Sequence, residues 1–174
     1  LLSIGWRGSW IGGQEIAFDT KDSKSLRFHK KWVDLDNIED IFNQFSIEWS
    51  SEQPYVISLD LDGNDFYLIE RLLTIGARPN LFICEYNSIL PIGSHWKIKY
   101  DKSHRWAGDN YFGASLTSLV ELFEVHGYFI CACNPQTGAN AFFVKKKYKN
   151  LFPDIPENVD DIYCTPFWMR DNSF

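Results

Sequence analysis

The stretch Ser58-Leu-Asp-Leu-Asp-Gly-Asn-Asp65 decides the fold, because it joins an apolar strand to a helix and places three carboxylates at the junction. Its apolar residues predict a buried strand, and its Gly-Asn pair predicts a turn before residues at helical spacing. Strand side chains alternate between faces, so Asp60 and Asp62 are expected on the same side. Ligands bind beyond the carboxyl ends of strands in open α/β sheets, which favours a metal or substrate role here. The alternative is that Asp62 and Asp65 only cap the helix.

The same arrangement recurs at the next predicted strand. Leu81-Phe-Ile-Cys84 is a continuous apolar run, and it is followed directly by Glu85, Tyr86 and Asn87. Between the two strands, the spacing predicts a helix that begins after the acids and ends near Gly76. We therefore expect two neighbouring strands that both end in polar groups.

Two further strands are predicted nearer the N-terminus, at Ser9 to Gly12 and at Leu26 to Val33. The first ends at Gly12-Gly13, and Glu15 lies just past it. A carboxylate there could accept hydrogen bonds from a ribose, or could be an acid in the first turn of a helix. Asp34 follows the second strand, and Asp36 with Glu39 predicts the start of a helix.

The segment from Ser88 to Ser115 shows little periodicity but many aromatic and polar side chains. A loop of this length inside a domain is usually functional, and its aromatic content argues against disorder. We expect it to form a lid or wall over a substrate. His95 or His104 is a candidate general base, although a histidine in a loop is often only solvent-exposed.

The C-terminal part predicts a helix from Ser115 to Gly127 and two strands, Tyr128 to Cys133 and Ala141 to Val144. The linker between these strands is short enough for an antiparallel hairpin. The whole order predicts an α/β fold, a Rossmann-like and mostly parallel sheet with helices on both faces and a C-terminal antiparallel hairpin strand. We expect residues 1–150 to form the α/β domain and residues 151–174 to form an irregular tail.

Composition excludes several classes of partner. The chain has 174 residues, 45% of them hydrophobic, and a net charge of -6, so it has no basic footprint for nucleic acid. It shows neither a membrane span nor a signal peptide. The four cysteines lack the spacing of a zinc or redox pair, which favours reduced thiols and a cytoplasmic location. The first residue is Leu1 and the one methionine is Met169, so we expect a piece of a longer protein.

Five short motifs in order carry a resemblance to a known family. They are Gly5-Trp-Arg-Gly8, the stretch Ser58 to Asp65, Cys84-Glu-Tyr-Asn87, Tyr111-Phe-Gly-Ala-Ser-Leu116 and Asn140-Ala-Phe-Phe-Val144. Together they resemble the FkbM-like group of class I S-adenosylmethionine-dependent methyltransferases, over roughly residues 5–144. The resemblance implies O-methylation of a hydroxyl on a sugar or another small molecule.

The resemblance also implies where the methyl donor binds. Glu15 would hold the ribose hydroxyls near Gly12 and Gly13, and Asp34 would lie near the adenine. In this fold the glycine-rich loop that cradles the methionine part follows an earlier strand, and Gly12-Gly13 does not replace it. That half of the cofactor site is expected before Leu1, and if Leu1 is the true start, cofactor binding is not expected.

The acids at the two strand ends resemble the metal site of cation-dependent O-methyltransferases. Carried over, Asp60 or Asp62 and Glu85 or Asn87 would bind a divalent ion, and oxygen ligands suit Mg²⁺. Such an ion would lower the pKa of the acceptor hydroxyl.

Two other functions stay open. Asp60-Leu-Asp62-Gly63 resembles the opening of haloacid-dehalogenase-type phosphatases, in which the first Asp is a nucleophile and the second an acid/base. Asn64 stands where that family usually has Thr, and the motif lies mid-chain. The third possibility is a non-catalytic binding domain of the same fold. The oligomeric state is not predicted.

Overall fold

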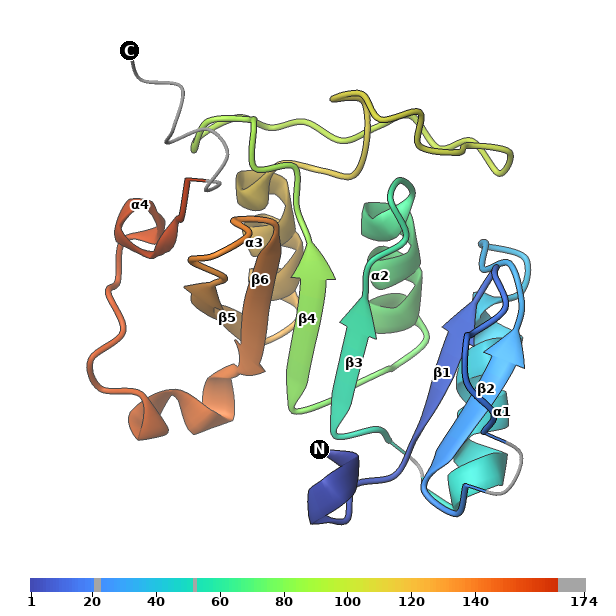
Figure 1. Cartoon of the computed structure of the whole chain (residues 1–174). Coiled ribbons are helices and arrows are strands. Elements are labelled where there is room, and N and C mark those ends of the chain that lie inside the picture. The colour runs from blue at the N-terminus through green and yellow to red at the C-terminus, as the bar shows by residue number, and fades with distance from the viewer. Residues whose placement is uncertain (21–22, 52, 166–174) are drawn as a thin grey trace.

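The strands form two separate sheets in the computed structural model, which describes residues 1–20, 23–51 and 53–165 (Figure 1). In the smaller sheet, β1 (Gly8–Gly12) pairs in parallel with β2 (Leu26–Lys30). The larger sheet contains β3 (Val56–Leu59), β4 (Leu81–Glu85), β6 (Asn140–Lys145) and β5 (Tyr128–Cys133), in that spatial order. The chain is thus a mixed α/β protein, as predicted.

Strand direction in the larger sheet is partly as expected. β3 and β4 are parallel, while β6 runs antiparallel to both β4 and β5. The predicted hairpin is confirmed, and its second strand lies between β4 and β5. The structure corrects the expectation of one sheet, because β1 pairs with β2 and with no other described strand.

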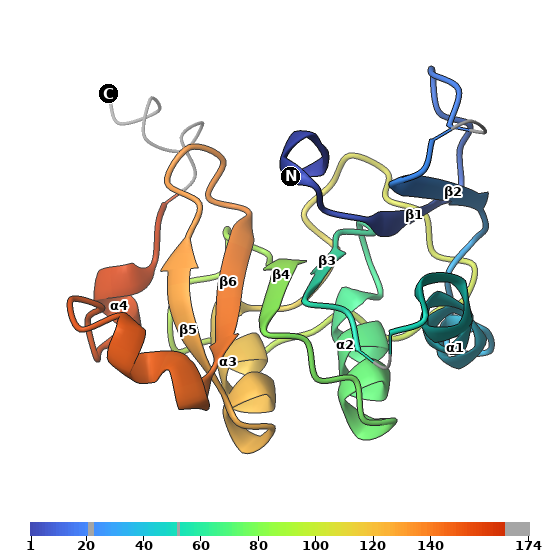
Figure 2. The same ribbon diagram turned by 90° about the horizontal axis from the view of Figure 1, so that it is seen from below.

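The three longer helices cover one face of the strands. They are α1 (Ile38–Trp49), α2 (Asp65–Thr74) and α3 (Leu116–Val125), and Figure 2 shows them all on the same side. The expectation of helices on both faces is therefore wrong for the described residues. The physical reason lies in the polar connection between β1 and β2, whose described residues form no helix and so leave the opposite face without one.

Aromatic rings hold α3 against the sheet. Phe123 of α3 stacks on Phe143 of β6 with ring centroids 4.0 Å apart. The Phe123 ring also meets Phe82 at a tilt and Tyr128 edge to face. All four rings are buried. This packing fixes which face of β4 looks toward the helices, since Phe82 and Cys84 are fully buried there.

The helix ends show one agreement and one correction. The Ser115 side chain caps α3 by accepting a hydrogen bond from the Ser118 amide, as predicted. The helix expected from Asp36 begins instead at Ile38, and its N-cap, Asn37, makes no side-chain bond to the helix. The Asn37 side chain accepts a bond from the Asp34 amide, which orders the turn before the helix.

The C-terminal segment contains a 3-10 turn, η2 (Lys146–Leu151), and a short helix, α4 (Val159–Ile162). Ile162 is buried in the core, and the Tyr163 hydroxyl donates a 2.8 Å bond to the Ser88 carbonyl. Residues near 160 therefore pack on the body of the protein.

Candidate metal centre

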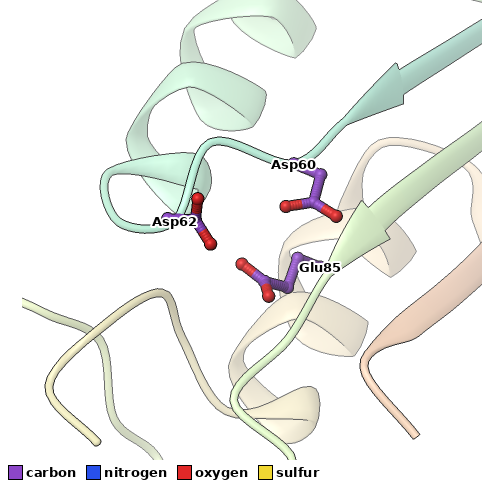
Figure 3. A group of neighbouring side chains, drawn as sticks. All are labelled: Asp60, Asp62 and Glu85. Atoms are coloured by element: carbon purple, nitrogen blue, oxygen red, sulfur yellow. The ribbon is translucent and has the colours of Figure 1, made fainter. Parts of the chain in front are cut away.

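Asp60, Asp62 and Glu85 come together at the carboxyl ends of β3 and β4 (Figure 3). Asp60 follows the last residue of β3, and Glu85 is the last residue of β4. Leu59 pairs in register with Cys84, so the next residues of the two strands lie side by side. One carboxylate oxygen from each of the three acids lies within 4.8 Å of the others. Parallel pairing of adjacent strands thus turns two separate motifs into one group.

The turn after β3 shapes this group. Asp62 has a φ of 54°, in the left-handed region that residues other than glycine seldom adopt. Asp65 is buried, and its carboxylate accepts bonds of 2.9 Å from the amides of Leu61 and Gly63. Asp65 therefore holds the turn that precedes α2, and it does not cap the helix, whose N-cap is Asn64 with no side-chain capping bond. Strained residues of this kind concentrate at functional sites, and Asp62 fits that pattern.

The three carboxylates repel one another. Burial and the charges of Asp60, Asp65 and Asp62 raise the pKa of Glu85 to about 9. Burial and the charge of Asp62 also raise the pKa of Asp60. Burial raises the pKa of Asp65 to about 6, against the opposing effect of its backbone hydrogen bonds. Because the pKa of Glu85 lies above neutral pH, this side chain holds a proton near pH 7.

One oxygen of the Glu85 side chain lacks a hydrogen-bond partner in the described part of the chain. Its Oε2 atom is buried and bonds to none of the described residues. A buried polar atom without a partner costs free energy, and a bound cation would supply the missing interaction. Three carboxylates from two strand ends fit a hard divalent cation, such as Mg²⁺, that takes oxygen ligands and keeps several waters.

The segment 88–115 passes over this end of the sheet, as a lid would (Figure 1). It is attached to the turn after β3 in two places. The Gly113 amide donates to the Gly63 carbonyl at 3.0 Å, and the Asn64 side chain donates to the Asp101 carbonyl at 2.8 Å. The His104 ring packs so closely on Gly63 that a side chain at Gly63 would overlap it. Residues 88–115 (the lid) and residues 60–64 (the acidic turn) are therefore one connected unit.

The side chain of the predicted ligand Asn87 is bonded to the lid. Asn87 is buried, and its side-chain amide donates to the carbonyls of Asn110 and Phe112, at 2.9 and 3.1 Å. Its role in the structure is to hold the returning part of the lid.

The two candidate bases lie in different places. His104 is half-buried beside Gly63, and its Nε2 atom bonds to none of the described residues. His95 is exposed and pairs with Glu121 of α3, with 3.2 Å between Nδ1 and the carboxylate. Of the two, only His104 adjoins the acidic turn.

The two acids predicted to hold the methyl donor lie beyond β1 and β2, and each is paired with a lysine. Glu15 is exposed and pairs with Lys30 at 2.8 Å. Asp34 is buried, accepts a bond from the Asp36 amide at 2.9 Å, and lies 3.3 Å from Lys102. Gly12 is the last residue of β1, and a side chain at the following Gly13 would crowd a tryptophan ring. Both acids thus have a lysine partner, and the assignment of these four residues to the cofactor stays a prediction.

Two features were missed by sequence reasoning. Lys102 neutralises Asp34 from the lid, and no local pattern signals a pair 68 positions apart in the chain. A cavity of about 860 Å³ extends between β1 and β3 as far as Asp60. Its walls come from segments that are distant in sequence, so periodicity could not reveal it.

Comparisons with known proteins give no match, either to a protein-family model, to a curated protein or to a solved structure. None of the helices in the described part has the length and apolar character that a membrane crossing needs. The site itself therefore carries the functional argument.

Proposed function

We propose that this chain is the acceptor-binding part of a divalent-cation-dependent enzyme that acts on a hydroxyl group of a carbohydrate or another small molecule. The observation that carries the proposal is the convergence of Asp60, Asp62 and Glu85 under a lid rich in aromatic side chains. Methyl transfer from S-adenosylmethionine within a Rossmann-like fold is the reaction that the sequence motifs favour.

The chain's own residues have distinct tasks in this proposal. Asp60, Asp62 and Glu85 would hold the cation, and Glu85 would release its proton when the cation binds. A bound divalent cation supplies Lewis acidity that lowers the pKa of a coordinated hydroxyl. His104, beside the acidic turn and with an unbonded Nε2, would receive the hydroxyl proton.

The lid offers surfaces for an acceptor. Trp106 and Tyr111 are both 50% exposed, although large aromatic side chains are usually covered. Their rings pack edge to face with Phe112 and Trp96 of the same segment, which orients them. Ordered, exposed aromatic faces are suited to stacking on a sugar ring.

Calorimetry tests the cation and the donor separately. We expect Mn²⁺ and Mg²⁺ to bind the chain with a stoichiometry of one and to compete with each other. S-adenosylhomocysteine, the product of methyl transfer, is then titrated with and without Mg²⁺. No cation binding would overturn the proposal, whereas cation binding with no response to S-adenosylhomocysteine would remove methyl transfer by this chain alone.

The same acids favour a second activity. Asp60 is exposed at the end of β3 with Asp62 two residues later, the arrangement that a phosphatase of the haloacid-dehalogenase type would use. Release of phosphate from p-nitrophenyl phosphate in Mg²⁺, lost in Asp60→Asn, would support this activity over methyl transfer. A chain that binds cations but catalyses neither reaction would be a binding domain.

A further inference from the structure

Two of the four cysteines come together where the C-terminal segment meets the larger sheet. Cys133 is the last residue of β5, and Cys164 closely follows α4, which lies beside β5 (Figures 1 and 2). The Cys164 thiol donates a 3.8 Å hydrogen bond to the Cys133 carbonyl. Both thiols are free. They are 31 positions apart in the chain, so no local spacing signals the pair.

A β-bulge separates the surroundings of Cys133 from those of Cys131. Residues two positions apart share a face of a regular strand, but the register of β5 against β6 shifts by one residue at Cys131. Cys133 lies opposite Ala141, on the face that carries the buried ring of Phe143. Cys133 is therefore only 5% exposed, whereas Cys131 is half-buried.

The buried side chain of Tyr86 contacts both members of the pair. Its hydroxyl donates a 3.2 Å bond to the Cys164 carbonyl. Burial raises the pKa of the Cys133 thiol to about 11, against opposing hydrogen bonds from the Tyr86 hydroxyl and the Cys164 backbone. The pKa of Cys131 is raised by burial alone. Cys164 therefore adjoins Cys133 rather than Cys131.

We propose that Cys133 and Cys164 form a site of reversible oxidation, at which hydrogen peroxide joins the two sulfurs in a disulfide. Cys164 reacts first, because it is half-buried while Cys133 is buried and protonated. Its sulfur attacks one peroxide oxygen, the O–O bond breaks, and a sulfenic acid and a water form. Cys133 then attacks the sulfenic sulfur, and its proton leaves with the hydroxyl group as a second water. The two sulfurs lose two electrons, which the peroxide gains.

The disulfide would fasten the C-terminal segment beside the start of the lid. Tyr163 precedes Cys164, and its hydroxyl donates to the carbonyl of Ser88, the first residue of the lid, at 2.8 Å. A cross-link between β5 and this segment restricts the unfolded chain and opposes local opening of α4. Disulfides with an exposed sulfur are readily reduced, so a dithiol should restore the free pair.

Peptide mapping of the full chain tests the site. The reduced chain is treated with hydrogen peroxide, its remaining thiols are blocked with iodoacetamide, and it is digested with trypsin without reductant. Trypsin separates Cys84 and Cys164 from each other and from the peptide that holds Cys131 and Cys133. Cys131→Ser is the matched control, because it removes a thiol from the same strand and keeps the proposed pair. Cys133→Ser breaks the pair.

We expect the Cys164 peptide to be linked to the Cys133 peptide in the unaltered chain and in Cys131→Ser, and to be released by dithiothreitol. Cys133→Ser should not form this link. Oxidation should also slow amide exchange in α4 at least about 10-fold. Cys164 recovered unlinked or as its sulfinic acid would overturn the proposal. A link that persists in Cys133→Ser, or that forms equally well in the urea-unfolded chain, would also overturn it.

The result is independent of the proposed function, because neither variant changes an acid of the candidate metal centre.

Discussion

Two pairs of parallel strands in this protein end in acids, and the two ends have opposite electrostatic surroundings. Beyond β3 and β4, Asp60, Asp62 and Glu85 face one another, and no ion pair to a described basic side chain neutralises them. Beyond β1 and β2, lysines neutralise the acids: Lys30 pairs with Glu15 and Lys102 with Asp34. We therefore expect a cation to bind only at the end where no described lysine pairs with the acids.

The largest expected effect comes from removing Glu85 from the acid group. Glu85→Gln keeps the size of the side chain and loses the charge that a cation would bind. We expect affinity for Mn²⁺ to fall at least about 100-fold, because even partners outside the coordination sphere change metal affinity 10- to 100-fold. Calorimetric titration of Mn²⁺ measures this directly.

Glu15→Gln is the matched control, since it removes the same charge from the lysine-paired end of β1 and β2. Its Mn²⁺ affinity should equal that of the unaltered chain. Equal affinity in Glu85→Gln and the unaltered chain would mean that the cation binds elsewhere.

The next effect is on the pH dependence of stability without metal. Burial and neighbouring acids raise the pKa of folded Glu85 from 4.5 to about 9. Between these values the folded protein keeps a proton that the unfolded chain has released, so stability falls as pH rises through this window. In EDTA, we expect the thermal midpoint to drop between pH 5 and pH 8 by at least about 2–4 °C, the equivalent of 1 kcal/mol for a chain of this size.

Two changes should flatten this pH profile. Glu85→Gln removes the titrating group, and saturating Mg²⁺ stabilises the deprotonated form by binding only the folded state. A midpoint that rises from pH 5 to pH 8 in EDTA would contradict the charge repulsion inferred for the acid group.

The contrast between the two ends also shows what sequence can reveal. The convergence of Asp60 and Glu85 follows from local information, because two short apolar runs separated by one helix form adjacent parallel strands. The main helices and strands of residues 1–150 lie close to their predicted positions for the same reason, as hydrophobic period and turn residues act over short distances.

The roles of Asn87 and Asp34 depend instead on contacts with residues that are distant in the sequence. Asn87 follows β4 as Glu85 does, yet its amide bonds to carbonyls 23 and 25 residues later in the lid. The lysine that reaches Asp34 comes from the same lid. Nothing near Asn87 or Asp34 in the chain encodes these contacts, so the predicted ligand and the predicted cofactor contact could not be distinguished from structural residues.

A smaller effect is expected at the buried acid of the lysine-paired end. Asp34→Ala removes the acceptor of the Asp36 amide and the partner of Lys102. Loss of a hydrogen bond that leaves a partly buried donor unpaired costs about 1–3 kcal/mol. Urea unfolding should show this loss, while the affinity for Mn²⁺ stays unchanged; a drop in that affinity would instead link the two strand ends through the lid.

The smallest effect is expected from Lys30→Met. Its partner Glu15 and Lys30 itself both have side chains more than 50% exposed, and exposed ion pairs contribute about 0–1 kcal/mol. Removing the lysine leaves Glu15 without its cation but still hydrated, unlike Glu85, whose Oε2 is buried. Lys30→Met should therefore change neither the urea midpoint measurably nor the Mn²⁺ stoichiometry. A second bound Mn²⁺ in this variant would show that the lysine alone prevents β1 and β2 from holding a cation, and that burial of the acid is not required.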